Sequence, residues 1–124
     1  MTIADLQQLN GKTIAKLERT ATEIDDMISD PEIDLDDESR LIARRGVVFA
    51  ELTTQSIMRA HLKASQIAVE FTAPQTNELD NLETKLDGFI ISGLKVNAML
   101  NLIPKVIDTA SKIGTRISSH TAMA

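Results

Sequence analysis

The stretch that decides the fold is IAKLERTATEIDDMI, residues 14–28. Its apolar residues recur at spacings of 3, 4, 3 and 4, and they are Ile14, Leu17, Ala21, Ile24 and Ile28. This spacing places their side chains along one side of an α-helix, because 3.6 residues make one turn. The stretch therefore predicts a long helix, residues 3–29, that packs lengthwise against another helix.

The next segment predicts a helix end, a loop and a second long helix. Ser29-Asp30-Pro31 ends the first helix, because Pro31 has no backbone N–H and disfavours helical geometry at the residue before it. An acidic loop follows, and the second helix is expected over residues 36–71. Its heptad-like register is interrupted by Gln55 and consists of Leu41, Val48, Leu52, Leu62 and Val69. Further apolar residues widen this surface, namely Val47, Phe49, Met58 and Ile67.

The C-terminal third of the chain predicts two more helices. Thr72 and Gln75 match a capping box, and Pro74 fits a first helical turn, so a third helix is expected over residues 73–102. Pro104 restarts a fourth helix, 103–118, followed by a tail, 119–124. This last helix has apolar residues at spacings of 4, 3 and 4, namely Val106, Ala110, Ile113 and Ile117. Whether the third and fourth helices form one kinked rod or a folded-back pair is left open.

Together these segments predict one all-α domain, residues 1–124. Short loops favour an antiparallel, up-and-down bundle of three or four helices with elongated, coiled-coil-like packing. The aromatic content agrees with this fold class, because the chain has three Phe, no Trp and no Tyr. Its core must then be built from aliphatic side chains, which suit helix–helix packing better than a β-sandwich.

Charge and composition narrow the function classes. The net charge is −5, from 13 basic and 18 acidic residues, which disfavours binding to nucleic acid. The chain has no cysteine, so it has no disulfide and no thiol chemistry. No Sec-type signal peptide and no apolar stretch of about 18 residues is visible. We expect a cytoplasmic protein, or one exported without such a signal, and a membrane is not the favoured partner.

The most distinctive polar feature is an acidic segment. Residues 23–38 hold nine of the 18 acidic side chains. Asp30, Glu32 and Asp34 match the first, third and fifth positions of an EF-hand, but Leu35 and Leu41 stand where its glycine and its bidentate glutamate belong. A solvated loop is therefore the simplest interpretation. The alternative is a docking patch for a basic partner, formed by Asp30, Glu32, Asp34, Asp36 and Asp37.

No motif predicts catalysis. His61 and His120 show no metal-ligand spacing, and the chain has no serine nucleophile motif, phosphate-binding glycine loop or dinucleotide fingerprint. Arg40 and Arg44 are one helical turn apart and are expected to pair with the acids at 36 and 37. We expect no catalytic residue, no cofactor, no metal and no small-molecule substrate.

The leading hypothesis is a non-enzymatic protein–protein interaction module: an adaptor, chaperone or assembly subunit whose partner is another protein or a second copy of the chain. Long heptad stripes in so short a chain suggest seams left for a partner. The candidate interface residues are Ile14, Leu17, Ile24, Ile28, Val106, Ile113 and Ile117. An equally weighted interpretation makes them the core of the monomer. Two other functions stay open: an acidic inhibitor or immunity-type protein that docks through residues 23–38, and a membrane-active protein that uses residues 89–107.

Overall fold

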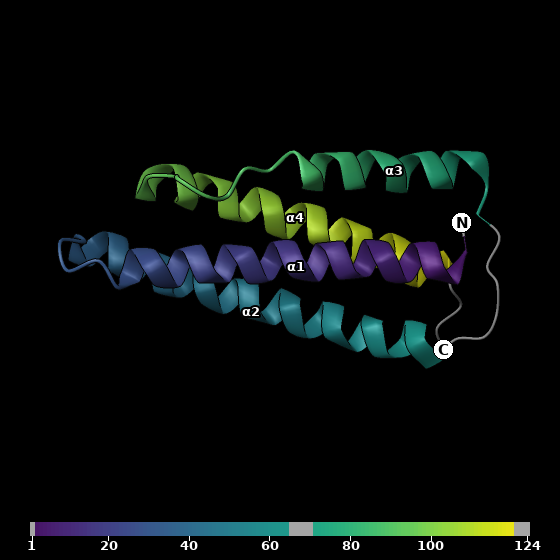
Figure 1. Cartoon of the computed structure of the whole chain (residues 1–124), viewed down its shortest axis with the longest axis horizontal. Helices are drawn as coiled ribbons and strands as arrows, with labels where there is room; N and C mark the ends of the chain where they lie inside the picture. Colours follow the sequence, from purple (N-terminus) through teal and green to yellow (C-terminus); the bar gives the residue numbers. More distant parts are fainter. Residues whose placement is uncertain (1, 65–70, 121–124) are drawn as a thin grey trace.

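The computed structural model describes residues 2–64 and 71–120, which form four α-helices and contain no strand. The helices are α1 (Ile3–Ile28), α2 (Leu35–Ala64), α3 (Ala73–Asp87) and α4 (Val96–His120). They lie side by side along the long axis of the molecule (Figure 1). The prediction of an all-α, bundle-like fold is confirmed at this level.

Three of the helices, α1, α2 and α4, pack on one another, and α3 packs on α4 and α1. Within the described residues, α2 and α3 do not touch. Figure 1 shows these two helices at opposite edges of the bundle. As a result, α2 has helical neighbours on its inner side only, and this arrangement decides where a partner can dock.

Capping boxes fix the starts of α1 and α3. The Thr2 backbone N–H donates to Asp5 Oδ2 over 2.9 Å, and the Asp5 backbone N–H donates to Thr2 Oγ1 over 3.1 Å. Thr72 and Gln75 exchange the same two bonds, at 2.9 and 3.3 Å. Each box satisfies backbone donors that the first helical turn leaves free. The predicted cap at Thr72 is confirmed.

The third helix is much shorter than expected. It ends at Asp87 rather than at residue 102, with Gly88 as its C-cap, and residues 88–95 form a loop. Gly93 in this loop has a φ of 77°, which is unfavourable for residues with a side chain and incompatible with a continuous helix. The loop lets α4 fold back against α3, so the two are a folded-back pair. The helix ends before Gly88, and Gly93 keeps the apolar residues 89–94 in a loop rather than a helix.

The remaining helix boundaries also differ from those expected. α4 begins at Val96, not at residue 103, so Pro104 lies inside it. Pro104 is exposed, and the helix continues past it with one backbone donor missing. α2 begins at Leu35, one residue before the expected start. The expected extension of this helix across residues 65–70 lies outside the described residues, as does most of the tail, 121–124.

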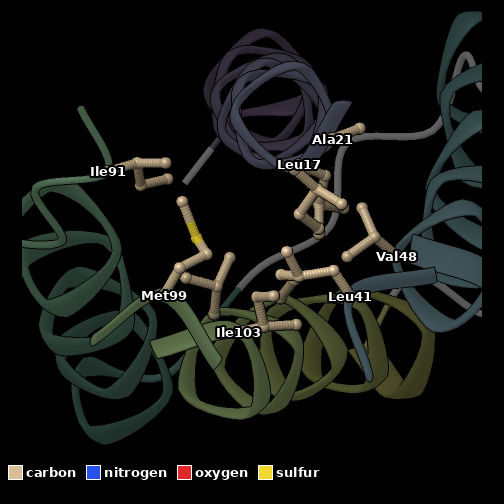
Figure 2. Packing of buried hydrophobic residues seen from close by; sticks show 10 residues of the cluster. Leu17, Ala21, Leu41, Val48, Ile91, Met99 and Ile103 are labelled. Carbon is tan, nitrogen blue, oxygen red and sulfur yellow. The ribbon is translucent and has the colours of Figure 1, made fainter. Parts of the chain in front are cut away.

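The interior consists of two hydrophobic clusters, one towards each end of the bundle. In one of them, side chains from three helices and the 88–95 loop converge, as Figure 2 shows for Leu17, Ala21, Leu41, Val48, Ile91, Met99 and Ile103. The other cluster is formed by Leu6, Leu9, Met58, Leu62, Leu79, Leu86, Ile113 and Ile117. Of the register predicted for α2, Leu41, Val48 and Leu62 are buried and Leu52 is half-buried. Its last member, Val69, lies outside the described residues.

A buried polar contact links three helices inside the bundle. Gln55, which interrupts the apolar register of α2, is fully buried. Its Nε2 donates to the backbone carbonyl of Ala110 on α4 over 3.0 Å, and its oxygens accept from Asn10 on α1. Gly114 on α4 makes room for it, because a Cβ at that position would lie 2.8 Å from Gln55 Nε2. Such a polar contact favours one lengthwise register of the helices over others.

Candidate interaction surface

The heptad stripes proposed as an interface lie inside the single chain. The side chains of Ile14, Leu17 and Ile24 on α1 are buried, and so are those of Val106, Ile113 and Ile117 on α4. Ile28 is half-buried against the same core. The chain's own helices enclose these side chains, which is the arrangement expected if they form the core of the monomer. These side chains are therefore not free to contact another molecule in the folded chain.

The acidic segment covers the end of α1, the largely exposed loop between α1 and α2, and the start of α2, and it uses some of its carboxylates locally. Asp30 accepts a bond from the backbone N–H of Glu32 over 3.0 Å, and Asp34 accepts one from that of Asp36 over 3.4 Å. Asp37 is half-buried, whereas the other four members of the patch are exposed. A cavity of about 430 Å³ lies between this loop and Leu94, Lys95 and Val96. The five predicted residues are thus close together at one end of the bundle.

Two of the three arginines that follow this loop, Arg40 and Arg45, pair with acids of the same chain, whereas Arg44 forms no ion pair among the described residues. Arg40 lies 3.0 Å from Asp36, one helical turn away, as predicted. Arg45 lies 2.9 Å from Asp25 on α1. The four side chains are between 43% and 68% exposed, so water screens these pairs and they add little to stability. They do neutralise part of the charge of the acidic segment.

Neither a metal site nor a membrane span is found in the part of the chain that the structure describes. There, no three His, Cys, Asp or Glu side chains gather in a way that could hold a metal ion. Over the same residues, no helix is both long enough and apolar enough to cross a membrane. His61 is exposed near the end of α2.

The unexpected feature is the solvent-facing side of α2. The large apolar side chains exposed on this helix include Leu35 (78%), Ile42 (50%), Phe49 (45%) and Ile57 (56%). Leu35, Ile42 and Phe49 are seven residues apart, which is close to two helical turns, so they lie on one side. Apolar side chains gathered on one exposed side, rather than scattered singly, mark an interaction site.

Smaller residues complete this stripe. From Leu35 to Ala64 the steps are 4, 3, 4, 3, 4, 4, 3 and 4 residues, which average the 3.6 of an α-helix and therefore follow one straight line along it. We call this line the outer face of α2, and its members are Leu35, Ser39, Ile42, Gly46, Phe49, Thr53, Ile57, Ala60 and Ala64. All nine are exposed and none is charged.

Large and small side chains alternate along most of the outer face. Leu35, Ile42, Phe49 and Ile57 are separated by single small residues, namely Ser39, Gly46 and Thr53. A Cβ at Gly46 would meet no atom within 4 Å, so the space above it is open. The Thr53 hydroxyl donates to the backbone carbonyl of Phe49 over 3.0 Å, which satisfies its donor without a partner. The outer face is therefore a row of apolar ridges with hollows between them.

Charged residues flank the outer face. Glu38 and Lys63 each lie three residues after a member of the face, Leu35 and Ala60, so both stand on the same flank. Neither has an ion-pair partner among the described residues. Arg45 stands on this flank too, with its guanidinium carbon 5.3 Å from the centre of the Phe49 ring. Cation–π contact of this kind helps to hold the ring in place.

A groove between α2 and α4 is the neighbouring candidate. It consists of three adjoining cavities of about 440, 340 and 240 Å³; the first two share Arg44 and Val47, and the last two share Ser111. Its walls carry charged side chains of both signs, namely Arg40, Arg44, Glu51 and Asp108. The outer face carries none, which makes it the more apolar of the two surfaces.

Comparison with protein-family models, curated proteins and solved structures found no match to this chain.

The apolar periodicity of α2 includes the residues of the outer face, but it does not separate them from the buried residues. From the sequence, Phe49 and Val47 only widen the apolar surface of the second helix, and Ile42 lies next to the buried Leu41. The sequence of α2 therefore contains two series of apolar residues, one buried and one exposed. The positions of α1 and α4 decide which of the two series these helices bury.

Proposed function

We propose that this protein is a non-enzymatic helical interaction module, an adaptor, chaperone or assembly subunit, that binds another α-helix on the outer face of α2. The observation that carries the proposal is the uncharged, exposed row from Leu35 to Ala64, with four large apolar side chains that the other three described helices leave exposed. Leaving these side chains in water costs free energy that a docked helix would recover.

The shape of the outer face suits a helix better than a loop or a strand. At about 1.5 Å per residue, its 30 residues extend over roughly 45 Å, and a straight row of ridges and hollows matches the ridges of a second helix. The proposal also includes a finer description of the bundle: neighbouring helices run in opposite directions and pack as in a coiled coil. Such packing would hold α2 rigid, so that docking costs little ordering.

The proposal is tested by placing a photoreactive aromatic amino acid at position 49 in the full chain, expressed in cells. We expect a covalent adduct with a protein partner, which mass spectrometry identifies as another protein or as a second copy. The matched control carries the same group at Asn81, which is exposed on α3. If position 49 gives no more adduct than position 81, the outer face of α2 is not a docking surface.

Purified components then give the affinity. With the identified partner, Ile57→Asp is expected to weaken binding at least about tenfold, because it places an unpaired charge inside an apolar contact. Asn81→Asp is expected to leave the affinity unchanged. Equal affinities for both variants would argue that the adduct at position 49 came from random encounters.

A second candidate function is docking of the acidic segment on a basic partner, as an inhibitor or immunity-type protein would do. It is supported by three exposed carboxylates without an ion-pair partner among the described residues, those of Asp30, Glu32 and Asp34. Their replacement by Asn, Gln and Asn would abolish such binding without unfolding the bundle. Unchanged affinity for the basic partner would exclude this function.

A further inference from the structure

We infer that the helix that docks on the outer face of α2 is the α2 of a second copy of this chain, running in the opposite direction. This inference rests on the proposed function and goes beyond it by naming the occupant and its orientation. Three features carry it: the alternation of large and small side chains, the position of the flanking charges, and the closure of a two-fold pair.

The alternation makes the outer face complementary to itself when two copies run antiparallel. In one register, Phe49 faces Thr53 of the second copy, Ile57 faces Gly46, and Ile42 faces Ala60. Each of these three large side chains then meets a small one, and the two-fold axis repeats every contact a second time. Close approach is possible because Gly46 has no side chain and its surroundings are open. Helices that meet at small residues pack with their backbones close together, so their ridges interlock.

The flanking charges favour the same register and the same direction. In an antiparallel pair, a given flank of one helix lies beside the same flank of the other. The register above brings Glu38 beside Lys63 of the second copy, and Lys63 beside Glu38, which gives two opposite-charge pairs. In a parallel pair, each flank would instead lie beside the opposite flank of the second copy, so Glu38 and Lys63 would not meet. Since neither residue has an ion-pair partner within the described part of its own chain, both charges are available.

A second copy also covers the outer face from Ser39 to Ala64. A two-fold pair is closed, so both copies use this contact at once and neither is left to recruit further copies through it. α1, α3 and α4 do not obstruct it, because α1 and α4 lie on the inner side of α2 and α3 does not touch it. The groove between α2 and α4 stays open in such a pair.

Disulfide trapping tests the register directly, because the chain has no cysteine of its own. Gly46→Cys and Ile57→Cys are made as separate variants of the full chain, and both positions are exposed. Mixed and mildly oxidised, they are expected to form a 46–57 cross-linked dimer. Each variant alone is expected to stay uncross-linked, because in the antiparallel pair two copies of one position lie roughly 16 Å apart along the helices, beyond disulfide reach.

Charge exchange tests the direction without covalent bonds. Glu38→Lys and Lys63→Glu are each expected to weaken the dimer several-fold, and the double variant Glu38→Lys with Lys63→Glu is expected to regain wild-type affinity. Lys105→Glu on α4 is the matched control, exposed and outside the contact, and is expected to leave the dimer unchanged. Failure of the double variant to recover would overturn the antiparallel pairing.

Other outcomes overturn the inference without touching the proposed function. A disulfide between two copies of Gly46→Cys would show a parallel pair. If no disulfide forms and the chain stays monomeric, while the photoreactive group at position 49 captures a different protein, the module binds that protein and not itself. If position 49 captures nothing, the proposed function falls as well.

Discussion

Asn10 on α1 and Gln55 on α2 are hydrogen bonded to each other in the interior of the bundle. The Nδ2 of Asn10 donates to Gln55 Oε1 over 3.2 Å and to the Gln55 backbone carbonyl oxygen over 3.1 Å. Because Gln55 Nε2 in turn donates to the Ala110 carbonyl, one side-chain pair ties together the three helices that pack on one another. These hydrogen bonds fix the lengthwise position of α2 relative to α1 and α4, and the outer face lies on the opposite side of α2.

The first prediction concerns this pair. Asn10→Asp replaces a buried donor with a carboxylate that faces two oxygen atoms, and we expect the free energy of unfolding to fall by about 3 kcal/mol or more at neutral pH. Burial raises the pKa of the new carboxyl above its unfolded value. The loss is therefore present above the unfolded pKa and shrinks as the pH falls, when the neutral acid can donate again.

Denaturant unfolding of this variant and the wild type at pH 7 and pH 4 checks the prediction. The control is Asn81→Asp, which is exposed and is expected to change stability by less than about 0.5 kcal/mol. A constant difference between Asn10→Asp and wild type at both pH values would contradict the described hydrogen bonds.

The second prediction separates two helical glycines. Gly114→Ala puts a Cβ 2.8 Å from Gln55 Nε2, which must move and give up its bonds, so we expect a loss of about 1–3 kcal/mol. Gly11→Ala meets no atom within 4 Å, so we expect a gain of about 0.5–1 kcal/mol from helix propensity. Thermal unfolding should order the melting temperatures as Gly11→Ala, wild type, Gly114→Ala, and the reverse order would show that the polar contact is not packed as described.

The third prediction concerns the N-terminal cap. Bonds from the backbone N–H and the side chain of Thr2 lower the pKa of the Asp5 carboxyl below its ordinary value. The stabilisation from Asp5 is therefore present at neutral pH and is lost as the pH falls through this lowered pKa. Titration by NMR should show the low value in the wild type and a rise in Thr2→Ala. An ordinary pKa for Asp5 in the wild type would exclude the capping box.

The fourth prediction contrasts the inner and outer apolar series. Leu17→Asp with Ile24→Asp places two charges at fully buried positions and is expected to unfold the chain. Ile42→Asp with Phe49→Asp changes two side chains that are about half exposed in the monomer, so the helical fold should survive. Circular dichroism measures both. A folded Leu17→Asp, Ile24→Asp variant would mean that the α1 stripe is a surface after all.

The sequence predicted those parts of the fold that local signals determine. The 3–4 spacing from Ile14 to Ile28, the proline after Asp30 and the cap at Thr72 were sufficient to predict helices and several of their ends. The end of α3 was missed because the apolar run after Gly88 masks a loop that depends on the positive φ of Gly93.

The outer face of α2 could not be identified in the same way. Leu41 and Ile42 are adjacent in the sequence and equally apolar, yet one is buried and the other half exposed. Which of them faces a neighbour depends on where α1 and α4 pack, and this is a property of the whole fold. For the same reason, the stripes of α1 and α4 could not be assigned to core or interface from their periodicity.

The most direct test of the central claim is the molar mass of the chain in solution, measured by light scattering for the wild type and for Ile42→Asp with Phe49→Asp. The account predicts twice 13.6 kDa for the wild type and 13.6 kDa, with unchanged helicity, for the variant. Because dimers depend on concentration, the measurement should span about a hundredfold range. A wild type that stays at 13.6 kDa throughout, or a variant that stays dimeric, would contradict pairing through the outer face of α2.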